Sequence, residues 1–188
     1  MSNRRSLIYR IGPLLVAALV VIGDRLSKDA VAHSIGFFDS ISIIPGWLRL
    51  IHTENSGAAF GVLSEGTHPL VRSALLIGVS GVVLTYVAFA LWSRTTSYAS
   101  AVTRFALALI LGGAIGNLYG RIVHGAVTDF IEIYHGAWSF PAFNVADSAI
   151  TVGAILLLFD LLRPRRKHDQ TTAGSGVPSG PDRFADTK

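Results

Sequence analysis

The chain has 188 residues, of which 51% are hydrophobic and only 15% are charged, and its mean hydropathy is +0.50. This composition is typical of a membrane protein rather than a water-soluble domain. The absence of cysteine excludes disulfides, thiolate metal sites and a cysteine nucleophile. The formal net charge of +4 accompanies no nucleic-acid-binding motif, so we attribute it to membrane topology.

The first apolar segment is short and runs into charged residues. Residues 11–23 are uncharged, and the following DRLSKDAVA places Asp24, Arg25 and Lys28 in the outer half of any span. Alone, this pattern fits a cleaved signal peptide equally well, with AVA at 30–32 as the cleavage site. Asp24 and Lys28 lie four residues apart, so they share a helix face as an ion pair. That pair either anchors two helices or contacts substrate.

A long connection follows, with the sequence GFFDSISIIPGWLRLIHTENSGAAFGVL. It has short runs of β-branched and aromatic residues, broken by Pro-Gly and Asn-Ser-Gly turns, so we predict short strands. Its large apolar side chains suit a platform at the head-group level of a membrane or an ordinary loop packed on the helices. Composition does not separate these alternatives, which concern Phe37, Phe38, Ile43, Ile44 and Trp47.

Three further apolar segments follow, and each is about as long as the twenty residues that cross a bilayer core. We predict spans at residues 11–32, 70–92, 104–123 and 143–162. Nine lysines and arginines flank the spans on one side and three on the other, which places both termini in the cytoplasm. Residues 1–167 then form the membrane domain. Residues 168–188, rich in Gly, Ser, Thr and Pro, form a disordered cytoplasmic tail.

The third span carries polar residues that packing alone does not explain. In GGAIGNLYGR, Gly113, Asn117 and Arg121 fall on one helix face. Small residues let helices approach closely, which accounts for the glycines. A buried asparagine one turn from an arginine needs acceptors, and the nearest carboxylates in sequence are those of Asp129 and Asp147.

Asp129 follows the third span and Asp147 opens the fourth, so we place both at the outward-facing membrane boundary. Two carboxylates ~4 Å apart in an effective dielectric of ~20 repel by about 4 kcal/mol, so one proton is shared. Such a pair activates water and protonates a leaving amine, which is the chemistry of aspartic peptidases. The alternative for each aspartate is a helix cap, and Asp147 suits that role.

Five motifs, in order, resemble those of the lipoprotein signal peptidases, the signal peptidase II family. They are DRLSK, TENSGAAFG, GGAIGNLYGR, VTDFI and FPAFNVADSAI, and they cover about residues 20–155. The resemblance implies an all-α membrane protein with four transmembrane helices and a small extracytoplasmic β cradle in the first outer loop. It also implies that the first span is retained, which favours a span over a cleaved signal peptide.

The same resemblance implies an aspartyl endopeptidase of the bacterial cytoplasmic (inner) membrane, with its active site at the outer face and no metal or cofactor. Its substrates are prolipoproteins, cut just before a cysteine that bears a diacylglyceryl group. The implied catalytic pair is Asp129 and Asp147. The implied supporting or substrate-binding residues are Asn144, Asn117, Arg121, Asn55, Asp24, Lys28 and Gly113. We expect a monomer whose partners are prolipoproteins and membrane lipids, without nucleic acid.

The chain departs from the family pattern at two motifs. GNLYGR replaces the common GNLIDR, so Tyr119 and Gly120 stand where a hydrophobic and an acidic residue are usual. An acid at position 120 therefore cannot be required for catalysis in this chain. DRLSK replaces the common DQLTK, which brings in Arg25 and Ser27.

Two other classes of protein place carboxylates near membrane spans. A proton-coupled transporter needs polar residues at the bilayer midplane on several helices, whereas here they gather at one boundary. A metallopeptidase would need ligands such as Asp129, Glu132 and His135. The sequence has no HExxH or comparable spacing.

Overall fold

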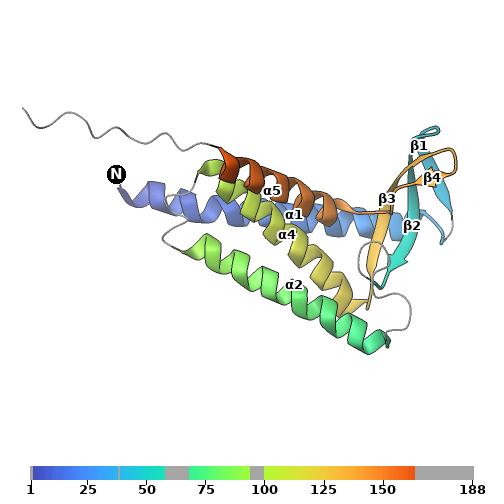
Figure 1. Ribbon diagram of the computed structural model, residues 1–188, viewed down its shortest axis with the longest axis horizontal. Coiled ribbons are helices and arrows are strands. Elements are labelled where there is room, and N and C mark those ends of the chain that lie inside the picture. Colours follow the sequence, from blue (N-terminus) through green and yellow to red (C-terminus); the bar gives the residue numbers. More distant parts are fainter. Residues whose placement is uncertain (1, 38, 58–67, 94–99, 164–188) are drawn as a thin grey trace, which may run out of the picture.

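The structure is a computed structural model that describes residues 2–37, 39–57, 68–93 and 100–163. Its helices run alongside one another, and a small sheet lies at one end of the bundle (Figure 1). The N-terminal end of α1 and the C-terminal end of α5 lie at the opposite end. The helices within the described residues are α1 (Ser2–Ser34), α2 (Pro69–Trp92), α4 (Ala101–Val123) and α5 (Val145–Leu162).

Three of these helices are long and apolar enough to cross a membrane. They cover Leu70–Trp92, Ala101–Val123 and Val145–Leu162, close to three of the four predicted spans. The first predicted span lies within α1, a helix of 33 residues that carries Asp24, Arg25, Lys28 and Asp29 in its second half. A crossing by α1 stays a prediction, and the predicted tail lies outside the described residues.

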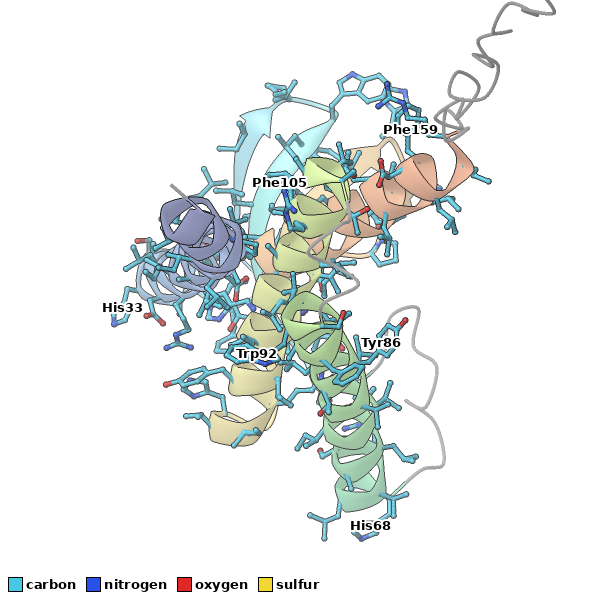
Figure 2. The ribbon with its side chains drawn as sticks, turned by 90° about the vertical axis from the view of Figure 1, so that its left-hand side faces the viewer. His33, His68, Tyr86, Trp92, Phe105 and Phe159 are labelled. Carbon is cyan, nitrogen blue, oxygen red and sulfur yellow. The ribbon has the colours of Figure 1, made fainter. Side chains whose placement is uncertain are left out.

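The helix α4 packs against all three of the other helices. One apolar cluster holds them together and consists of Ala17, Val87, Leu107 and Leu111. The helix α2 differs from α4, because many of its large side chains are exposed. Tyr86 is 70% exposed and Trp92 is 79% exposed. Figure 2 shows Tyr86 projecting away from the bundle. Such a face is suited to lipid.

The sheet has four antiparallel strands in the order β1-β2-β3-β4. Their bounds are β1 (Ser40–Ile44), β2 (Leu48–Asn55), β3 (Val127–His135) and β4 (Trp138–Ser139). The connection between α1 and α2 supplies only β1 and β2, so a cradle confined to that loop was an incomplete prediction. The nine residues VTDFIEIYH form β3 because β-branched and aromatic residues recur along them.

A second apolar cluster attaches the sheet to the end of α1. It consists of Val31 and Ile35 on α1 and Phe130 on β3, and Val145 packs against it. Successive side chains of a strand point to opposite faces. Burial of Phe130 on one face therefore fixes Asp129 on the other, where it is 2% exposed.

The large apolar residues of the connection between α1 and α2 are not packed on the helices. Ile43 and Ile44 are each 51% exposed, and Phe37 and Trp47 are each 57% exposed. The exposed side chains favour the platform over the packed loop. Phe38 lies outside the described residues.

Candidate active site

The buried polar residues of the described structure belong to elements that meet at the sheet end of the bundle. They are Asp24, Lys28, His52, Asn117, Asp129, Glu132 and Asn144. Most of them are joined by hydrogen bonds into one network. This clustering at one end fits the boundary site expected from the sequence better than a path through a transporter.

The first turn of α5 brings Asp147 into the network. Asn144 is the N-cap residue, and its Oδ1 accepts a hydrogen bond from the Asp147 N–H at 2.9 Å. The Asp147 Oδ2 accepts in return from the Asn144 N–H at 3.3 Å, which completes a capping box. The interpretation of Asp147 as the cap itself is therefore wrong. Its other oxygen, Oδ1, accepts from Asn117 Nδ2 at 2.7 Å.

Asp129 is held on β3 by two amide donors. Its Oδ1 accepts from Asn144 Nδ2 at 2.7 Å, and its Oδ2 accepts from Asn55 Nδ2 at 2.9 Å. Burial raises the pKa of the Asp129 carboxyl to about 6. The hydrogen bond from Asn55 opposes this shift, while the negative charge of Asp147 adds to it.

Asn144 therefore contacts both aspartates at once. Its side-chain NH₂ reaches Asp129, while its backbone N–H and side-chain oxygen bond to Asp147. The two carboxylates come from different elements, a strand and a helix, and a single residue fixes their relation. An acid with a raised pKa beside a second carboxylate is an arrangement that can hold one shared proton.

Behind this pair lies the ion pair predicted between Asp24 and Lys28. The Lys28 Nζ donates to Asp24 Oδ2 at 2.7 Å and to Asn117 Oδ1 at 3.0 Å. The Asp24 Oδ1 accepts from the Ala146 N–H at 2.9 Å, in the first turn of α5. Of the two roles left open by the sequence, this geometry shows the helix anchor. The pair links α1 to both α4 and α5.

Arg121 and Gly113 both lie on α4, as Asn117 does. Arg121 Nη1 donates to the Asn117 carbonyl oxygen at 3.5 Å, and no ion pair joins it to either aspartate among the described residues. Its Nε is buried without a partner in the same part of the chain. Gly113 instead lets α4 and α5 approach: an added Cβ would lie 2.7 Å from Ile150 Cγ1.

The two departures from the family motifs meet in space. The Arg25 guanidinium lies over the Tyr119 ring, 4.7 Å from its centroid, and pairs with Asp29 at 2.9 Å. At Gly120, an added Cβ would lie 3.0 Å from the Ala126 carbonyl oxygen. An acidic side chain at position 120 would therefore be crowded here.

The candidate metal ligands of the metallopeptidase alternative do not come together. Glu132 forms an ion pair with Arg49, and His135 stacks on Trp47 with ring centroids 4.4 Å apart. Among the described residues, no three His, Cys, Asp or Glu side chains are grouped so as to hold a metal ion.

Comparison with known proteins places the chain in a family. A family model described as signal peptidase (SPase) II matches residues 16–163. The chain belongs to the signal peptidase II family. This is a family of aspartic peptidases, and the matched residues include every member of the network described above.

Curated relatives agree with the signal peptidase II model. A lipoprotein signal peptidase of Solibacter usitatus is 41% identical over 152 residues, which cover 81% of this chain and 91% of the relative. One from Yersinia pseudotuberculosis is 39% identical over 158 residues, covering 82% and 89%.

Two solved structures share the signal peptidase II fold seen here. Both are described as bacterial membrane enzymes determined by the in meso method, at 2.3 Å and 1.9 Å resolution. The first has a TM-score of 0.73 at 28% identity and covers 87% of this chain and 94% of that chain. The second has a TM-score of 0.72 at 27% identity and covers 82% and 94%.

Proposed function

We propose that this signal peptidase II removes the signal peptide from diacylglyceryl-modified prolipoproteins and cuts just before the lipidated cysteine, with Asp129 and Asp147 as its catalytic pair. The relatives named above are lipoprotein signal peptidases, which supports the substrate class. The observation that carries the assignment of residues is the bridging of both carboxylates by Asn144. Asp129 is buried and Asp147 is half-buried at the sheet end of the bundle, which suits a substrate that is itself held in lipid.

In the proposed reaction, Asp147 is ionised and Asp129 carries the shared proton. Water attacks the scissile carbonyl carbon while Asp147 takes one of its protons, and the proton of Asp129 passes to the carbonyl oxygen. Collapse of the tetrahedral intermediate returns a proton from oxygen to Asp129, and Asp147 protonates the leaving amine of the cysteine. The pKa of about 6 at Asp129 supports its role as the proton carrier.

The amide donors around the pair prepare it for this reaction. Asn117 donates to Asp147, while Asn55 and Asn144 donate to Asp129, so both carboxylates are held before substrate arrives. Donors fixed in advance need no reorganisation during the reaction. The unpartnered Nε of Arg121 is a further N–H, which we assign to a carbonyl oxygen of the substrate.

We also propose a topology of four spans in the cytoplasmic membrane, with both termini in the cytoplasm and the sheet at the outer face. Residues 1–167 form the membrane domain, and the exposed platform of β1 lies at the head groups. The chain has no cysteine, so single cysteines can be introduced cleanly. Ser40→Cys and Ala137→Cys should react with an impermeant maleimide from outside, whereas Ser97→Cys should not. Labelling of Ser97→Cys from outside would contradict the topology.

Cleavage of lipidated and unlipidated precursor by the purified protein tests the substrate. Acyl chains contribute about 0.8 kcal/mol per buried CH₂, so we expect a preference for the lipidated form of about a hundredfold or more in kcat/KM. The Asp129→Asn protein provides the background rate. Equal rates on the two precursors would show that the lipid is not required, although the protein would still be a peptidase.

A further inference from the structure

A buried lysine lies behind the carboxylate pair and takes no part in the proton transfers proposed above. The Lys28 side chain is only 5% exposed, and its ammonium bonds to Asp24 and to the Asn117 side-chain oxygen. The bond to Asp24 lies within α1, whereas the bond to Asn117 joins α1 to α4. The second bond also reaches the network of the carboxylate pair, because the other end of the Asn117 amide touches Asp147.

The Lys28 ammonium determines which way the Asn117 amide points. An ammonium has three N–H donors and no acceptor, whereas an amide has an oxygen acceptor and an NH₂ donor. With Oδ1 at the ammonium, 3.0 Å from Nζ, the NH₂ faces Asp147 and donates to its Oδ1 at 2.7 Å. The reverse orientation would set two donors together at Lys28 and two acceptors together at Asp147.

The neighbouring amide is oriented in the same sense by a different donor. Asn144 Oδ1 accepts from the Asp147 backbone N–H, so its NH₂ is left to donate to Asp129 Oδ1 at 2.7 Å and to Asn117 Oδ1 at 3.3 Å. The Asn117 side-chain oxygen thus accepts hydrogen bonds from both Lys28 and Asn144. The orientation of the donor on Asp147 is therefore set by two donors to the Asn117 oxygen, of which the charged Lys28 ammonium is the nearer.

We propose that Lys28 is a positioning residue: acting through Asn117, it keeps an N–H donor on Asp147, so that Asp147 is the ionised member of the pair and Asp129 holds the proton. This inference rests on the proposed function, because it assigns the two protonation roles within that catalytic pair. A second cation, Arg121 on α4, lies close enough to interact with both carboxylates. Burial raises the pKa of Asp129, and the positive charge of Lys28 acts in the opposite direction.

The test needs a variant that removes the cation without leaving Asp24 buried and unpaired, because a lone buried charge is strongly destabilising. The double variant Asp24→Asn/Lys28→Met removes both charges together. We expect it to insert and to melt in detergent close to the unmodified protein. Its kcat on lipidated precursor should fall by about tenfold or more, with KM changed by less than about twofold.

The pH profile separates positioning from anchoring. If Lys28 positions the donor on the carboxylate pair, its removal should displace the acidic limb of kcat/KM, whereas loss of a helix anchor alone should leave that limb in place. Lys28→Arg keeps a donor cation and should leave that limb in place. A double variant with unaltered kcat and acidic limb would overturn the proposal, as would an equal shift in Lys28→Arg.

Failure of the inference about Lys28 can be distinguished from failure of the proposed function. If Asp129→Asn or Asp147→Asn retains turnover, the catalytic pair itself is wrong, and the role of Lys28 falls with it. If both are inactive and the double variant keeps the unaltered pH profile, only the inference about Lys28 is overturned, and the ion pair serves as a helix anchor alone.

Discussion

The helices α2 and α4 offer spans of equal length, 23 residues each, in very different surroundings. Only 6% of the α2 window is buried within the protein, against 50% of the α4 window. Among the described residues, no buried polar side chain comes from α2, whereas α4 contributes Asn117. Lipid accepts almost any apolar side chain, while neighbouring protein requires particular shapes and donors. Substitutions should therefore matter far more on the side of α4.

The largest effect is expected at the carboxylates that α4 helps to hold. Asp129→Asn and Asp147→Asn should each lower kcat by on the order of 10³-fold or more, because an amide neither accepts the proton of water nor returns it. Asparagine is nearly isosteric, so membrane abundance should survive. Cleavage of lipidated precursor, measured against abundance, checks this.

A carboxylate at the other end of α5 provides the matched control. Asp160 accepts hydrogen bonds from Ser100 at 2.6 Å and from Thr103, far along the helix from Asp147. Asp160→Asn should keep its kcat and lose at most some thermal stability. Near-normal turnover in either variant of the proposed pair would return that aspartate to a structural role.

The next effect concerns how closely α4 packs. An added Cβ at Gly113 would meet Ile150 Cγ1 at 2.7 Å and also the Ala146 backbone, so Gly113→Ala forces α4 and α5 apart. We expect a loss of about 1–3 kcal/mol, typical of overpacking, seen as a lower melting temperature in detergent. Gly78→Ala on α2, where nothing lies within 4 Å, should be neutral or slightly stabilising. Equal melting temperatures for the Gly113→Ala and Gly78→Ala proteins would show that α4 is no more sensitive to packing than α2.

A smaller effect is expected in the pH dependence. The hydrogen bond from Asn55 lowers the pKa of Asp129, so Asn55→Ala should raise that pKa further above its ordinary value. Asp129 then loses the shared proton at a higher pH, and the alkaline limb of kcat/KM should move up by about one unit or less. Ser56→Ala is the control, because its hydroxyl accepts from Arg72 instead. A downward movement would contradict the proposed proton carrier.

The smallest effect is expected on the outer face of α2. Tyr86 is 70% exposed there, so Tyr86→Leu replaces one lipid-compatible side chain by another. Stability should change by less than about 0.5 kcal/mol and turnover not at all. A marked loss of activity with normal abundance would show that this face binds something more specific than lipid.

The sequence predicted the helices well because long apolar runs dominate their signal. The predicted segments 70–92 and 104–123 agree with Pro69–Trp92 and Ala101–Val123 to within three residues at each end. The strand Val127–His135 was not predicted, because its acidic residues were interpreted as site residues and its β-branched and aromatic content was not used. The pattern that would have revealed it was present in the sequence.

Spacing predicted the pair of Asp24 and Lys28, and motif resemblance predicted the other site residues, but the contact between the two strands was not predicted. Asn55 and Asp129 are 74 residues apart, and their contact depends on the β2–β3 register, which shifts between Leu50 and Thr53. No sequence spacing encodes such an irregularity. The cap of α5 was predictable in principle, because Asn144 and Asp147 stand three residues apart at the start of an apolar run.

The double role of Asn144 has a consequence for how the enzyme is made. The residue that starts the last helix is also the one that joins the two carboxylates, and its capping bonds to Asp147 form only with the first turn of that helix. Before that turn exists, Asp129 on β3 can bond to Asn55 but has no bridge to a second carboxylate. The pair proposed above as catalytic is therefore complete only once the last helix has started.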